Sequence, residues 1–258
     1  DNFYELLDFR TFYNYSRFIP NAYYPKDRNK IKLTQNSQGY ITLDQQYKIV
    51  WSIKNPDRFC FTDHPIIFYM GKASIICSNN KNETLYLFSL LNSPVAKLIL
   101  EIHLKIEQEK EYLTPIKAIK QFVRVPKITK DNQFIKDEII KCTEEILALE
   151  EKRLLDFVDF SKVMLQKFNK VSVEENSLIL EKNDKRIKLA IKEKKGLIKK
   201  ALAEKYNKQI LNLEKQKITL AELKDLPIID YDKQRKLKDY IDDLVFVLYF
   251  KVPLSRLY

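Results

Sequence analysis

Glycine is scarce in this chain, and its scarcity excludes one class of binding site. Only three glycines occur among the 258 residues, at Gly39, Gly71 and Gly196. A dinucleotide-binding turn of the form G-x-G-x-x-G and a phosphate loop of the form G-x-x-x-x-G-K both need glycines at close spacing. Nucleotide binding through a glycine-rich loop is therefore excluded.

Cysteine and long apolar runs are also scarce. Cys60, Cys77 and Cys142 are odd in number and widely spaced, which argues against the disulfide framework of a secreted domain. No second ligand pair accompanies Cys60 and His64, so a zinc site is not expected. No uncharged apolar run reaches the roughly twenty residues of a membrane helix, and the first residues lack the features of a signal peptide. We expect a cytoplasmic protein that does not contact a membrane.

The motifs of two catalytic activities are missing. Adenine methyltransferases need a motif of the Asn-Pro-Pro-Tyr type around the flipped base, whereas the only Asn-Pro pair here opens the sequence Asn-Pro-Asp-Arg at 55–58. Metal-dependent nucleases combine Pro-Asp with a Glu-x-Lys triplet. Such triplets at 150–152, 193–195 and 222–224 lie in charge-rich helical stretches, where they arise by chance. We therefore expect no catalytic residue, cofactor site or metal site in this chain.

Positive charge, by contrast, is abundant and concentrated. The formal net charge is +11, and residues 184–217 contain twelve Lys or Arg against four Asp or Glu. Basic side chains displace condensed counterions from phosphates, so this segment favours a nucleic-acid partner. A solvated, lysine-rich surface has the same composition, and charge alone does not separate the two explanations.

The apolar patterns predict an α+β fold. Residues 1–30 carry an aromatic cluster that is expected to cover a sheet. Residues 31–82 contain short apolar runs between Asn, Asp, Gly and Pro positions. These runs predict a small, mostly antiparallel sheet with strands at residues 32–33, 41–43, 48–53, 66–69 and 74–77.

Two consecutive helices and a further strand are expected next. Residues 85–91 are apolar on nearly every side and predict a buried helix that ends at Asn92. Ser93 supplies an N-cap oxygen, and Pro94 fits the first turn of a second helix. Residues 122–128 alternate apolar and basic side chains, which predicts a strand ended by proline. The expected buried face of the second helix consists of Val95, Leu98, Ile99 and Ile102.

A long helix is predicted at residues 132–155. Its apolar residues recur at heptad spacing, and we expect it to dock within the chain because it is too short to stand alone. A hairpin is expected around Asn183 and Asp184. The apolar positions of the long helix are Ile135, Ile139, Cys142, Ile146 and Leu149.

Three more helices are predicted after the hairpin. Residues 193–206 have an apolar side and a lysine side. Thr219 with Glu222 forms a capping box for a short helix, and Asp230 can cap the last helix. The last helix has an apolar face of Leu237, Ile241, Leu244, Val245 and Leu248.

The order of these parts resembles the TaqI-like target-recognition domain of type IIG restriction–modification enzymes, which methylate adenine. The resemblance rests on Leu-x-x-Leu-Leu-Asn-Ser at 87–93 and on Val-x-Val-Pro-Lys-Ile at 123–128. Residues 48–51 and 55–59 look like the strand and arginine-bearing turn that precede this helix in the family. Residues 240–249 are similar to its closing helix. The likeness covers about residues 40–160 and the last twenty.

The resemblance implies a role in reading DNA. Residues 1–130 would form the DNA target-recognition domain, 131–170 a long helix and connector, and 171–258 a small basic α+β subdomain. The partners would be double-stranded DNA and the methyltransferase and nuclease domains of the same polypeptide, from which this chain would be an excised piece. The parent enzyme would use S-adenosylmethionine and Mg²⁺.

Candidate DNA contacts follow from the chemistry of the side chains. Lysines fix a protein on phosphates, whereas Arg and Asn can match base edges in the major groove. The candidates are Lys54, Asn55, Arg58, Lys72, Lys81, Lys117, Lys120, Arg124, Lys194, Lys195 and Lys199.

Two alternatives remain. The chain resembles less closely the specificity subunit of a type I restriction system, which would show two recognition domains and two long repeated helices. A helical interaction protein without a DNA role would use the heptad helix and the last amphipathic helix to bind a partner. That alternative predicts no salt-dependent DNA binding.

Overall fold

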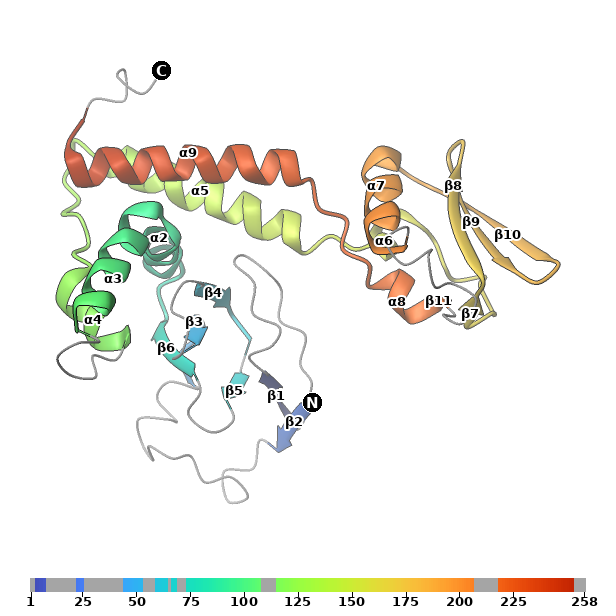
Figure 1. The fold of residues 1–258 in the computed structure, drawn as a ribbon, viewed down its shortest axis with the longest axis horizontal. Helices are drawn as coiled ribbons and strands as arrows, with labels where there is room; N and C mark the ends of the chain where they lie inside the picture. The colour runs from blue at the N-terminus through green and yellow to red at the C-terminus, as the bar shows by residue number, and fades with distance from the viewer. Residues whose placement is uncertain are drawn as a thin grey trace. The chain divides into compact units, whose positions relative to one another are not determined.

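The chain divides into two compact units, each with its own cluster of buried apolar side chains. Unit 1 consists of Asp1–Leu147 with Arg235–Tyr258, and unit 2 of Ala148–Gln234. Helices and small, mostly antiparallel sheets confirm the predicted α+β class (Figure 1). The computed structural model describes residues 3–7, 22–25, 44–52, 59–64, 66–68, 73–107, 115–206 and 218–252.

Unit 1 contains two three-stranded sheets, with strand orders β4-β3-β6 and β2-β1-β5. Strands β1 and β5 run parallel, and the other neighbours in these two sheets run antiparallel. The strands are β1 (Phe3–Leu7), β2 (Ala22–Pro25), β3 (Tyr47–Ser52), β4 (Phe59–Thr62), β5 (Ile66–Phe68) and β6 (Ala73–Ser78).

The sequence predicted three of these strands. Residues 48–53, 66–69 and 74–77 correspond to β3, β5 and β6. Strand β4 was missed because three of its four residues are buried, so the alternation that marks a half-buried strand is absent. The strands expected at 32–33 and 41–43 lie outside the described residues.

Three helices follow strand β6 along the chain. Asn80 caps α2 by accepting a hydrogen bond from the Glu83 amide at 3.1 Å, and α2 ends at Asn92 as predicted. Asn92 Nδ2 donates to the Phe59 carbonyl at 3.1 Å, which fixes the helix end on β4. The helices are α2 (Lys81–Asn92), α3 (Pro94–Glu107) and α4 (Pro115–Phe122).

Ser93 caps α3 as predicted, and its replacement by alanine should lower the free energy of unfolding. Its Oγ accepts from the Ala96 amide at 3.3 Å and donates to the Leu90 carbonyl at 2.6 Å. Loss of such a cap costs about 1–2 kcal/mol, measurable by urea denaturation. Ser172→Ala is the control, because the buried Ser172 hydroxyl has no hydrogen-bond partner within the described ranges. Equal effects of the two substitutions would contradict the capping role.

The predicted buried face of α3 is partly wrong. Ile99 packs against the core, but Leu98 and Ile102 are 59% and 45% exposed. Ala96 and Leu100 are buried in their place. Helical spacing predicts a buried face one residue wide of the observed one, because the pattern of Val95, Leu98, Ile99 and Ile102 does not specify which neighbouring surface covers the helix.

The strand predicted at residues 122–128 is also wrong. Phe122 ends α4, and the Val123 amide donates to the Ile119 carbonyl at 3.1 Å, as in a helix. Ile119 and Val123 are both buried and lie four residues apart. The start of this segment therefore follows the spacing of a helix and not the alternation of a strand. Residues 123–129 pair with no strand in the described part of the chain.

Two long helices, α5 and α9, complete the core of unit 1. Ile139 and Ile146 of α5 and Ile241 and Leu244 of α9 belong to one buried cluster, and Figure 1 draws the two helices side by side. The expectation that the heptad helix docks within the chain is confirmed. The helices are α5 (Gln133–Glu150) and α9 (Tyr231–Phe250).

The predicted boundaries of the second half differ from the units observed. Helix α9 was expected in a subdomain at 171–258, but its buried face lies in the core of unit 1. Residues 131–170 were expected to form a long helix and a connector, yet Leu154 and Phe168 within this range are buried in the core of unit 2. An amphipathic face predicts burial without naming the surface that buries it.

Unit 2 combines a three-stranded sheet, β10-β9-β8, with short helices and a two-stranded ladder, β11-β7. The predicted hairpin at Asn183, which has a φ of 50°, and the capping box of Thr219 and Glu222 are confirmed. The elements are α6 (Leu154–Phe157), β7 (Lys167–Phe168), β8 (Lys170–Glu174), β9 (Ser177–Lys182), β10 (Lys185–Ala190), α7 (Lys195–Tyr206), β11 (Ile218–Thr219) and α8 (Leu220–Lys224).

The chain enters and leaves unit 2 along two adjacent segments. The Leu154 amide donates to the Leu226 carbonyl at 2.9 Å, and the Ile228 amide donates to the Lys152 carbonyl at 3.0 Å. Arg153 and Pro227 form an antiparallel bridge between these bonds. The two ends of unit 2 are therefore hydrogen-bonded to each other.

Candidate nucleic-acid interface

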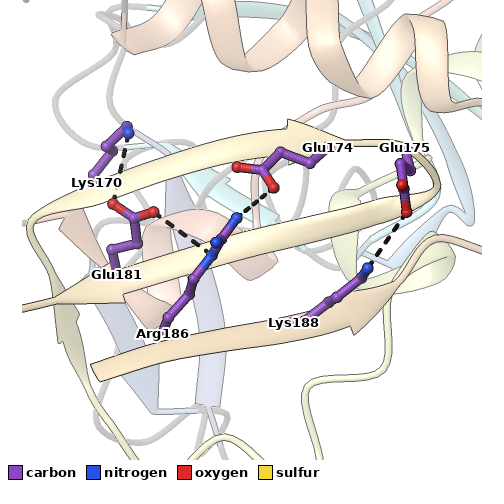
Figure 2. Close-up of polar contacts among 6 residues, drawn as sticks. All are labelled: Lys170, Glu174, Glu175, Glu181, Arg186 and Lys188. Carbon is purple, nitrogen blue, oxygen red and sulfur yellow. Dashed lines mark hydrogen bonds and ion pairs between the residues drawn. The ribbon is translucent and has the colours of Figure 1, made fainter. Parts of the chain in front are cut away.

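One face of the sheet in unit 2 carries a set of ion pairs, drawn in Figure 2. Lys170 Nζ lies 3.6 Å from Glu181, and the other carboxylate oxygen of Glu181 lies 3.8 Å from Arg186 Nε. Arg186 also pairs with Glu174. We call this set the charge ladder; its members are Lys170, Glu174, Glu175, Glu181, Arg186 and Lys188.

The charge ladder also covers an apolar residue. Ile179 is 1% exposed, and its cross-strand partners are Lys188 and Ser172. Directly opposed residues of antiparallel strands share one face, so the alkyl stem of Lys188 lies beside Ile179 while its Nζ reaches Glu175 at 3.5 Å. The cations of the ladder therefore have partners and a packing role within the fold.

A second group of cations in unit 2 is not compensated in this way. Four exposed lysines lie at the start and along the outer side of α7, and no ion pair joins them to a carboxylate among the described residues. The opposite side of α7 is held by Ile198 and Leu202, which are buried in the core of unit 2. We call these four residues the lysine cluster; they are Lys194, Lys195, Lys199 and Lys200.

The position of the lysine cluster lowers the stability of α7, the helix that carries it. Lys194 and Lys195 lie at the N-terminus of α7, where the helix dipole is already positive, and the first turn contains no acidic residue. Lys194 also has a φ of 60°, which is uncommon for a residue other than glycine. An arrangement that costs stability and concentrates positive potential is typical of a binding surface.

The predicted contacts in unit 1 are placed less uniformly. Lys81 Nζ donates to Glu144 at 2.6 Å, which joins α2 to α5, raises the pKa of Lys81 and compensates its charge. Lys120 and Arg124 are exposed at the end of α4 and after it. Lys117 lies in α4, but its side chain is outside the described set. Four further predicted contacts lie outside the described residues: Lys54, Asn55, Arg58 and Lys72.

Glu150, in one of the Glu-x-Lys triplets, is buried at the end of α5. Burial raises its pKa to about 7, and the hydrogen bond from Gln234 Nε2 and the charge of Arg153 act in the opposite direction. Arg153 Nη1 donates to the Glu150 carbonyl at 2.5 Å. Among the residues with described side chains, no three His, Cys, Asp or Glu converge as metal ligands. These contacts give Glu150 a structural role.

His103 is accounted for by packing. Its ring stacks on Phe122 with 3.7 Å between ring centroids and an interplanar angle of 1°. This contact joins α3 to the end of α4.

Comparison with known proteins gives no match to a family model, a curated protein or a solved structure. Over the described residues, no single helix has the length and apolar character to cross a membrane. The bent pair formed by residues 81–92 and 94–103 meets those criteria jointly, by length and composition alone.

Proposed function

We propose that this chain binds duplex DNA as the specificity region of a type IIG restriction–modification enzyme. The observation that carries the proposal is the lysine cluster, four exposed lysines of unit 2 that no described carboxylate neutralises. In the same unit, the cations of the charge ladder are paired. Positive charge without partners is what a phosphate backbone requires of its binding surface.

The two units would divide the work of recognition. The lysine cluster would hold phosphates, which fixes position without reading sequence. Base edges would be read from unit 1, where Lys120 is exposed at the end of α4 and where the resemblance places the reading loops. Since the sequence contains no Asn-Pro-Pro-Tyr motif, we assign methyl transfer and cleavage, with their S-adenosylmethionine and Mg²⁺, to catalytic domains outside this chain.

The proposal is tested by removing equal charge from the two cation groups of unit 2. The variant Lys194→Gln/Lys195→Gln/Lys199→Gln should bind random duplex DNA about 10- to 100-fold more weakly at low salt than the unchanged chain. The slope of log affinity against log salt should become shallower by about 0.9 for each phosphate that the variant no longer neutralises. Fluorescence anisotropy at several salt concentrations measures both quantities.

The matched control removes three cations that have partners in the structure. Lys170→Gln/Arg186→Gln/Lys188→Gln lowers the net charge by the same amount but affects residues of the charge ladder, so DNA affinity should change by less than about threefold. Equal losses in the two variants would show only a general effect of net charge, and no loss in either would contradict the proposal.

Sequence specificity needs a separate measurement. Repeated selection of DNA from a random pool by the unchanged chain should enrich one short motif. Tight, salt-dependent binding without enrichment would support DNA binding and contradict the role in specificity.

A further inference from the structure

A groove of about 650 Å³ lies on unit 1, between residues 124–132 and the last turn of α9. Its apolar lining includes Ile135 of α5 and Val247 and Leu248 of α9, all buried in the core. Val125, which also lines the groove, is 52% exposed. The groove thus has an apolar floor of buried core residues and an apolar wall, Val125, that is exposed to solvent.

The charged residues around the groove are mostly basic. Arg124, Lys127 and Lys251 line it and are exposed, whereas Asp131 is the acidic residue of the lining. No ion pair compensates the three cations among the residues described. The lining therefore combines apolar surface with an excess of positive charge.

The backbone of residues 123–128 offers hydrogen-bonding groups to a partner. This segment has the alternating pattern of a strand but pairs with none of the described strands. The Lys127 carbonyl accepts from Asn132 Nδ2 at 3.1 Å. The amides of Arg124, Val125 and Lys127 have no partner within the described part of the chain. A conflict between local preference and observed pairing is typical of a functional site.

We infer that this groove binds an extended segment of another protein in which apolar side chains alternate with carboxylates. Its apolar side chains would contact Val125 and Val247, and its carboxylates would face Arg124, Lys127 and Lys251. Its main-chain carbonyls would accept hydrogen bonds from the amides of Val125 and Lys127, which have no partner among the described residues. The apolar floor favours a peptide over a nucleic-acid backbone, which would leave that floor uncovered.

Labelled peptides of ten residues test the inference on the full chain. A peptide with leucine and glutamate in alternation should bind at least tenfold more tightly than one with leucine and lysine, or one with glycine, serine and glutamate. Val125→Asp should weaken the leucine–glutamate peptide at least tenfold. The control Leu98→Asp changes an apolar residue of similar exposure outside the groove lining and should leave binding unchanged.

Charge reversal makes the test stricter. Arg124→Glu/Lys127→Glu should lose affinity for the leucine–glutamate peptide and gain affinity for the leucine–lysine peptide. Equal binding of the two peptides, or equal effects of Val125→Asp and Leu98→Asp, would overturn the inference. Displacement of the peptide by unlabelled duplex DNA would reassign the groove to DNA. The lysine-cluster variant should bind the peptide normally, which separates this inference from the proposed function.

Discussion

Replacement of Leu244 by alanine is expected to lower the midpoint of one of two unfolding transitions and to leave the other unchanged. Leu244 lies on α9, is 1% exposed, and belongs to the buried cluster of unit 1. Truncation of a buried leucine to alanine costs about 2–5 kcal/mol, since apolar surface is no longer buried and a cavity remains. Because the two units have separate cores, calorimetry should resolve the loss in one transition.

The reciprocal substitution identifies the transitions. Leu180 of β9 is fully buried in the core of unit 2, so Leu180→Ala should lower the other midpoint. If Leu244→Ala and Leu180→Ala lowered the same transition, α9 would belong to the cooperative unit of residues 148–234, and the division of the chain would be wrong.

Glu150→Gln is expected to stabilise the protein at pH 8 and to have little effect at pH 4.5. Burial raises the pKa of Glu150 from 4.5 to about 7, so the folded state holds a proton that the unfolded chain releases between these values. The free energy of unfolding therefore falls as the pH rises from 4.5 to 7. Above pH 7 the full cost of burying the ionised Glu150 carboxylate is present. At about 1.36 kcal/mol per pKa unit, this shift corresponds to about 3.4 kcal/mol, so glutamine should restore about 3 kcal/mol.

The neighbouring Glu151 provides the control for this prediction. Glu151 is exposed, so Glu151→Gln removes the same charge without relieving burial and should change stability by less than about 0.5 kcal/mol. Urea denaturation of both variants and the parent at pH 4.5, 6 and 8 gives the comparison. A gain for Glu150→Gln that does not depend on pH would exclude titration of this carboxyl as its cause.

The sequence predicted the helix starts that carry a capping side chain, because capping is local, whereas the helix predicted to end at residue 155 ends at Glu150. Ser93, the box of Thr219 and Glu222, and Asp230, which accepts from the Lys233 amide at 3.0 Å, all act within a few residues of their targets. The unit that buries α9 was not predictable in this way. The apolar face of α9 is compatible with either core. Which unit buries it depends on contacts between residues far apart in the sequence.

The candidate site was predictable to a similar extent. Helical spacing alone placed Lys195 and Lys199 away from the buried side of α7. The pairing of Lys81 with Glu144, 63 residues away, depends on how α2 meets α5. The groove beside Val125 was missed for the same reason, because α5, α9 and the segment after α4 build it together.

The hydrogen bonds between Lys152 and Ile228 and between Leu154 and Leu226 have an evolutionary consequence. A segment whose two ends are adjacent can be inserted, removed or exchanged while the residues before and after it stay close together in space. Residues 148–234 have the ends of such a module. Related chains could thus differ in residues 148–234 while keeping the fold of unit 1.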